Sequence, residues 1–219
     1  MNKNVITGII LGIIVLILCY IAFNWEKETV IDETPSYTIT NDSLKFKKEF
    51  EANNDKKNKV NISIKNYSTV TYSSYEEIFK KLESDESYIL FFASSTDENS
   101  RIMASVLVDK ALTLKQDIYY LDISNDMDTK ELTKDGKIKT IKKGSDNYYE
   151  LVKKLNGYLP AYKELNDDNV KRIYLPAVVF IQKGKIKKVV NIPVEISERK
   201  YNQTLSGEEI NILNNALSI

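Results

Sequence analysis

Histidine is absent from the 219 residues of this chain. The common base at neutral pH, the Ser-His and Cys-His pairs of nucleophilic catalysis, and most protein zinc sites all need that side chain. Its absence excludes much of hydrolase chemistry. We therefore expect neither a metal ion nor another cofactor.

Cysteine occurs once, as Cys19, inside an apolar segment. A single cysteine cannot form an intramolecular disulfide, and no pair of thiols is present to cycle between oxidised and reduced forms. Dithiol redox catalysis is therefore excluded.

Neither sign of charge is in excess, because 31 basic residues face 31 acidic residues. Proteins that bind nucleic acid usually carry a clear basic surplus. The balance predicts no nucleic-acid partner.

One long apolar run is present, at residues 5–23, and it contains no charged side chain. As a helix rising about 1.5 Å per residue it would span about 28 Å, close to the thickness of a bilayer's hydrocarbon core. Tyr20, Phe23 and Trp25 gather at its far end, where amphipathic aromatic side chains prefer the headgroup level. The run predicts a retained transmembrane helix.

The charges that flank this run predict its orientation. Lys3 precedes it, whereas acidic side chains outnumber basic ones just after it. The positive-inside rule then places residues 1–4 in the cytoplasm as a short stub and the rest of this single-pass protein outside the cell membrane. Cleavage as a signal peptide and lipidation at Cys19 stay open as alternatives.

A polar segment and a short extension are expected between the run and the main domain. Residues 24–42 contain Pro35 and predict a tether. Residues 43–68 predict an extension that packs on the domain at residues 69–219. Within the extension, helical apolar spacing indicates a helix capped by Asp42 or Ser43, and the alternation at residues 60–64 indicates an edge strand.

The chain from Tyr88 to Leu107 organises the domain. An apolar run to Ala93 is followed by polar residues and then by helical apolar spacing, which predicts a strand, a loop and a helix. Ser95 and Glu98 have the spacing of a capping box, and Asp97 adds a second carboxylate at the helix start.

Further elements follow in a regular order. The ranges 69–72, 117–123, 176–181 and 186–190 predict strands, and 74–82 and 208–217 predict helices. An insertion at about 130–170 is expected to hold a hairpin around Asp135-Gly136, a helix that begins at Ser145 or Asp146, and a polar loop at residues 166–169. Lys183-Gly184 predicts the turn of an antiparallel hairpin.

This order resembles the thioredoxin superfamily over residues 69–217. Three features carry the resemblance: the strand, loop and helix from Phe91 to Leu107, the strand that begins at Leu175-Pro176, and the Lys183-Gly184 turn. The subgroup is indicated by the phrases Ser94 to Met103, Tyr119 to Ile123 and Arg172 to Pro176. They are most similar to small membrane-anchored thioredoxin-like proteins of Gram-positive bacteria, some of which are described as bacteriocin transport accessory proteins. The resemblance implies a three-layer α/β/α fold with a mixed central sheet and an inserted hairpin and helix, preceded by the transmembrane helix.

The resemblance also implies where a site would lie. The family's Cys-x-x-Cys motif falls on Asp97 and Ser100, and neither side chain can supply the thiolate that the redox reaction needs. Pro176 falls where the family has a cis-proline that faces this loop, and the backbone of the preceding residue pairs with extended peptides in the family. Alternatively, Pro176 only fixes the start of the strand.

Three functions follow from these expectations. The first is an extracytoplasmic module without enzymatic activity, an adaptor or chaperone-like protein that binds a peptide or protein partner. Its expected site residues are Thr96, Asp97, Asn99, Leu175 and Pro176. The second is a structural subunit beside an active oxidoreductase or an export system. The third is a non-redox enzyme that uses Asp97, Glu98 and Ser100 for acid-base chemistry or to hold a cation.

Overall fold

The computed structural model describes residues 39–199 and 204–219, all of them within a unit that spans residues 37–219. The predicted transmembrane helix at 5–23 and most of the predicted tether lie outside the described residues. Among the residues that are described, no helix has both the length and the apolar character needed to cross a bilayer.

A five-stranded mixed sheet lies at the centre, in the order β1-β3-β2-β8-β9. Its members are β1 (Val70–Tyr72), β3 (Ile118–Leu121), β2 (Tyr88–Phe92), β8 (Ala177–Gln182) and β9 (Lys185–Asn191). The first three strands are parallel, and β8 and β9 are antiparallel to their neighbours. The predicted mixed α/β class is confirmed, and the arrangement is compatible with a thioredoxin-like fold.

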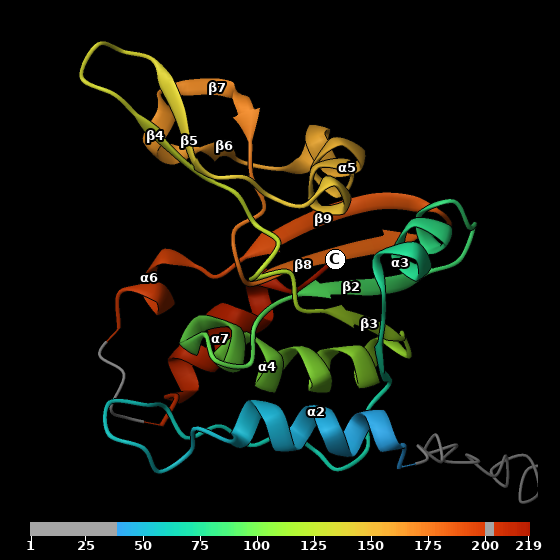
Figure 1. Cartoon of the computed structure of the whole chain (residues 1–219). Helices are drawn as coiled ribbons and strands as arrows, with labels where there is room; N and C mark the ends of the chain where they lie inside the picture. Colours follow the sequence, from blue (N-terminus) through green and yellow to red (C-terminus); the bar gives the residue numbers. More distant parts are fainter. Residues whose placement is uncertain (1–38, 200–203) are drawn as a thin grey trace, which may run out of the picture. The chain divides into compact units, whose positions relative to one another are not determined.

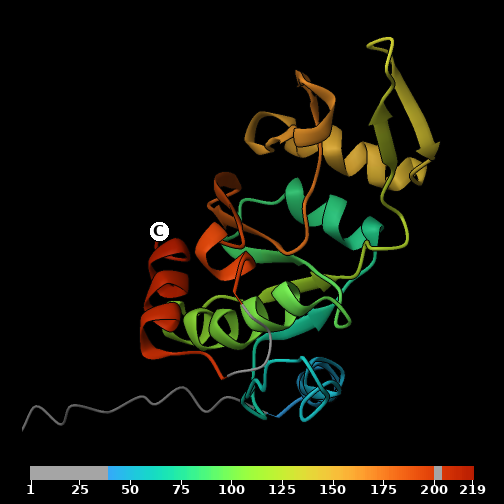
Figure 2. The same ribbon diagram turned by 90° about the vertical axis from the view of Figure 1, so that its left-hand side faces the viewer.

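Hydrophobic clusters lie on both faces of this sheet because alternate side chains of a strand point in opposite directions. On β2, Ile89 and Phe91 belong to one cluster, and Leu90 and Phe92 belong to the other. The first cluster includes residues of α2 (Asn41–Glu51), α4 (Glu98–Leu114), α6 (Val194–Ser197) and α7 (Gly207–Ala216). The second includes residues of α3 (Tyr75–Leu82) and α5 (Asp146–Leu155), which cover the opposite face (Figure 1, Figure 2).

The insertion contains the expected hairpin and helix. The hairpin consists of β4 (Thr129–Leu132) and β5 (Ile138–Lys142), which turn at Asp135-Gly136 as predicted, and α5 follows with Ser145 as its N-cap. A second small sheet of β6 (Ala161–Tyr162) and β7 (Asp167–Lys171) comes next, with single 3-10 turns at 156–158 and 163–165. The polar loop expected at residues 166–169 is therefore wrong, because most of it belongs to β7.

The edge strand expected at residues 60–64 is also wrong. Its alternation does describe burial, since Val60, Ile62 and Ile64 are buried and the residues between them are exposed. Their N–H groups, however, donate to side chains and not to a neighbouring strand. The acceptors are Glu98 Oε1 at 2.6 Å, Asn54 Oδ1 at 3.1 Å and Glu51 Oε1 at 2.6 Å, respectively.

Two predicted helix caps are displaced. Asp97, not Ser95, is the N-cap of α4, because its side chain accepts the N–H of Ser100, three residues ahead. Helix α2 is capped by Thr40 in a capping box with Ser43, and not by Asp42 or by Ser43 itself. The predicted capping box of Ser74 and Glu77 at α3 is confirmed.

Candidate functional site

Three chain segments meet at one end of the central sheet. Phe92, the last residue of β2, pairs with Ala177, the first residue of β8. Ala177 in turn pairs with Asn191, the last residue of β9. The loop after β2, the segment before β8 and the chain after β9 are therefore neighbours. The sheet register thus brings the predicted loop to the predicted Leu175-Pro176 segment.

The two side chains at the expected cysteine positions contact each other. Asp97 Oδ2 accepts hydrogen bonds from the backbone N–H and from the hydroxyl of Ser100, both at 2.7 Å. The hydroxyl oxygen of Ser100 also accepts the N–H of Ser94 at 3.3 Å. A carboxylate and a hydroxyl therefore meet where the resemblance implies a dithiol, and their bond also fixes the first turn of α4.

The outer part of this loop faces solvent. Thr96 is exposed, and its hydroxyl lies 3.1 Å from the hydroxyl of Ser94. Asp97 and Asn99 are half-buried, and Ser100 is buried. Of the loop residues expected to contact a partner, Thr96 is thus the most accessible.

The segment before β8 is held by a side chain that the sequence did not single out. The peptide bond between Leu175 and Pro176 is cis. The Asn191 amide donates to the carbonyl of Tyr174 at 2.7 Å and to the carbonyl of Pro176 at 2.9 Å. Leu175 lies between these two residues and is half-buried. Within the described part of the chain, neither its N–H nor its C=O makes a hydrogen bond. One backbone donor and one acceptor are thus free beside the loop.

An exposed apolar side chain lies at the same end of the sheet. Val194 follows β9 at the start of α6 and is 58% exposed. Thr96, Leu175 and Val194 thus come from three different segments, which the sheet register brings together at this end.

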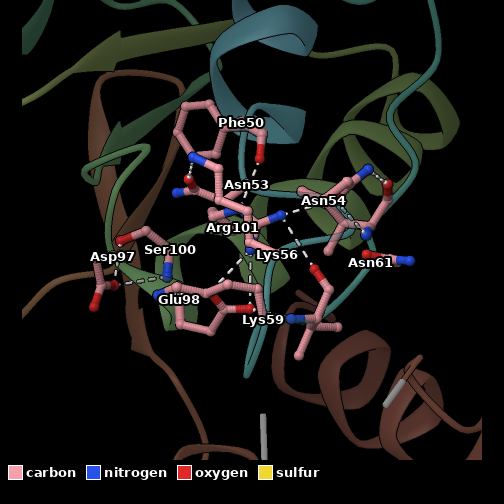
Figure 3. A network of polar contacts seen from close by, with 12 residues as sticks. Phe50, Asn53, Asn54, Lys56, Lys59, Asn61, Asp97, Glu98, Ser100 and Arg101 are labelled. Atoms are coloured by element: carbon pink, nitrogen blue, oxygen red, sulfur yellow. Dashed lines mark hydrogen bonds and ion pairs between the residues drawn. The ribbon is translucent and has the colours of Figure 1, made fainter. Parts of the chain in front are cut away.

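Behind the loop lies a buried ion pair that joins α4 to the N-terminal extension (Figure 3). Arg101 is 0% exposed and Glu98 is 7% exposed. One nitrogen of the guanidinium, Nη1, donates to both carboxylate oxygens of Glu98 at 3.0 and 2.9 Å. Its other nitrogens donate to Phe50 O at 2.7 Å, Asn54 Oδ1 at 2.8 Å and Val60 O at 3.1 Å.

The carboxylate of Glu98 has further partners on the extension. It accepts the N–H of Val60 at 2.6 Å, and the ammonium of Lys59 lies 3.4 Å away. The structure therefore does not bring Glu98 together with Asp97 and Ser100, as the proposed acid-base or cation site requires. Among the described residues, no group of three or more acidic or other ligating side chains is placed to hold a metal ion.

Aromatic packing joins the extension to the central sheet as well. Phe46 and Phe50 of α2 stack with their ring centres 4.2 Å apart, and both rings contact Tyr120 on β3. Burial raises the pKa of the Tyr120 hydroxyl, so this side chain stays neutral in the core.

Sequence reasoning missed three residues that shape this region, namely Arg101, Asn54 and Asn191. Arg101 could have been found, because an arginine on the otherwise apolar face of a predicted helix, three residues after Glu98, needs a buried partner. For Asn54 and Asn191 the sequence holds no such signal, since their acceptors are backbone or distant groups.

Comparison of the sequence with models of known protein families finds no match, and comparison with curated proteins finds none either.

Proposed function

We propose that this chain is a membrane-anchored, extracytoplasmic protein of thioredoxin-like fold that binds an extended segment of a peptide or protein partner without electron transfer. The binding face is the end of the central sheet formed by the loop at residues 94–100 and by Leu175-Pro176. The predicted transmembrane helix at residues 5–23 would hold this face outside the cell.

The free backbone of Leu175 is the observation that carries this proposal. Asn191 binds the carbonyls on either side and so fixes the direction in which Leu175 presents its own N–H and C=O. A bound segment in extended conformation can form hydrogen bonds with both groups, as in recognition by strand addition. Such binding tolerates many sequences because the main chain supplies the contacts.

The chemistry of the loop favours binding over catalysis. Asp97 and Ser100 are hydrogen-bonded to each other. The carboxylate of Glu98 is paired with Arg101 and accepts the N–H of Val60 in the extension. The domain contains no thiol, since Cys19 is the one cysteine. These residues make the loop rigid, which lowers the entropy cost of binding a partner.

Site-directed photocrosslinking of the full chain in the cell membrane tests the proposal. A photoreactive amino acid at Thr96 or Leu175 should capture the same partner. The matched control is Asp85, an exposed residue that precedes β2 and therefore lies at the opposite end of the sheet. Capture that is equally strong from Asp85, or no capture from Thr96 and Leu175, would contradict the proposed face.

A further inference from the structure

The β4–β5 hairpin is an isolated two-stranded sheet that stands away from the central sheet (Figure 1, Figure 2). All five residues of β5 are exposed, including two aliphatic side chains, Ile138 at 41% and Ile141 at 52%. A two-stranded hairpin has little stability of its own, and a third strand adds to it.

The two outer edges of this hairpin differ. On β4, the N–H of Lys130 donates to the hydroxyl of Tyr162 at 2.9 Å, so the outer edge of β4 contacts the β6 region. Among the residues that the structure describes, no strand pairs with the outer edge of β5. We call this the β5 edge.

The register identifies the backbone groups that the β5 edge presents. The N–H of Thr133 donates to the carbonyl of Lys137 at 2.9 Å, and hydrogen-bonded pairs alternate with non-hydrogen-bonded pairs in antiparallel strands. Ile138, the next residue, therefore directs its N–H and C=O outward. Thr140 does the same, because its partner Lys130 also directs its N–H away from the hairpin.

The side chains around the β5 edge carry a net positive charge. Residues 129–143 contain six lysines and two acidic residues. Asp135 lies 3.3 Å from Lys137 and Glu131 lies 3.7 Å from Lys139. At the two ends of the hairpin, Lys130 lies 3.0 Å from Asp128 and Lys143 lies 3.4 Å from Asp146. Among the described residues, Lys134 and Lys142 have no acidic partner, and residues 128–146, with six lysines and four acidic residues, keep a net positive charge.

The positive charge favours some strands over others as partners of the β5 edge. A second copy of the chain would place lysine-rich strands side by side, and like charges on paired strands are destabilising. Lysines on an exposed edge also discourage pairing with neutral strands. An acidic strand gains opposite charges, and its apolar side chains can contact Ile138 and Ile141.

We propose that the β5 edge binds an extended acidic segment of another protein, which adds a third strand by pairing with the backbone of Ile138 and Thr140. This surface belongs to the insertion and is separate from the binding face at Leu175. It gives the protein a second partner site, selective for negative charge.

The test uses the full chain in a nonionic detergent and a fluorescein-labelled peptide of about six alternating glutamate and valine residues, long enough to cover β5. Fluorescence anisotropy at low salt measures affinity. Thr140→Pro removes one outward N–H at a position where the hairpin itself needs no donor. Thr140→Val keeps that N–H and is its control.

Thr140→Pro should weaken binding at least about fivefold, and Thr140→Val should leave it nearly unchanged. Reversing charge with Lys139→Glu and Lys142→Glu should weaken it about tenfold or more. The same reversal at the exposed Lys185 and Lys187 of β9, an edge strand of the central sheet, should have little effect.

Three results would overturn the proposal. They are the absence of peptide binding, binding by Thr140→Pro equal to that by Thr140→Val, and equal binding of a peptide in which lysine replaces glutamate. The second result would mean that charge alone attracts the peptide, without strand pairing.

Discussion

The buried pair of Arg101 and Glu98 predicts a large loss of stability when only one charge is removed. Arg101→Met leaves the Glu98 carboxylate, 7% exposed, without its main partner. It also removes the donor from the carbonyls of Phe50 and Val60, whereas Asn54 Oδ1 keeps the N–H of Ile62. Breaking such a pair costs about 3–5 kcal/mol, and each buried acceptor without a donor adds about 1–3 kcal/mol when no water replaces it.

We expect Arg101→Met to lower the free energy of unfolding by at least about 4 kcal/mol, a large share of the ~5–15 kcal/mol typical of a domain. The double variant Glu98→Met with Arg101→Met should be less damaging than Arg101→Met alone, because no unpaired charge stays buried. The two substitutions should therefore be non-additive by about 2 kcal/mol.

Urea unfolding of the full chain in nonionic detergent, followed by far-ultraviolet circular dichroism, measures these differences. Lys80→Met, which removes an exposed i,i+4 pair with Glu76, is the matched control and should leave the unfolding midpoint in place. A loss below about 1 kcal/mol for Arg101→Met, or strict additivity in the double variant, would refute the argument.

Four further outcomes follow from the same contacts. Asp97→Ala should cost about 1 kcal/mol of unfolding free energy in the same assay and Asp97→Asn less, because asparagine still caps α4. Cysteines introduced together at Asp97 and Ser100 should form an intramolecular disulfide under oxidation, detected by mass spectrometry, because these side chains already meet at 2.7 Å. Glu51→Ala should speed amide hydrogen exchange at Ile64, whose N–H donates to that carboxylate. Burial raises the pKa of Tyr88 to about 12, above the value of about 10 in the unfolded chain. The stability that this neutral side chain contributes should therefore be intact below about pH 10 and be lost as the pH rises towards 12. Tyrosinate absorbance and unfolding, measured in parallel, follow this loss.

Most elements of the domain could be predicted because their signals are local. The apolar runs of β2 and β8, the Ser74 cap and the Asp135-Gly136 turn each depend on neighbouring residues. The cis bond before Pro176 also lies where the resemblance places a cis-proline.

The failures share a different cause. Residues 60–64 alternate as a strand does, but their hydrogen-bond partners are side chains of α2, α4 and the loop between α2 and this segment. Alternation reports which side chains are buried and says nothing of what satisfies the backbone. The spacing of Ser95 and Glu98 fits a capping box, but the Glu98 carboxylate binds Arg101 in the same helix and the N–H of Val60 in the extension, and Asp97 is the cap.

The candidate site could be predicted only in outline. The sequence located the loop and Leu175-Pro176, but not Asn191, which holds the carbonyls on both sides of Leu175. That contact depends on the register between β8 and β9, which shifts at Phe180 and Ile181 and is therefore not specified by the Lys183-Gly184 turn alone.

Amide hydrogen exchange at Leu175 is the sharpest test of strand addition at this face. In the full chain, the rate is measured with and without the partner captured from Thr96 or Leu175. Exchange at Leu175 should slow in the complex, because its free N–H becomes a hydrogen-bond donor to the bound segment, whereas exchange at the far end of the sheet near Asp85 should be unchanged. An unchanged rate at Leu175 in a saturated complex would contradict binding by strand addition at this face.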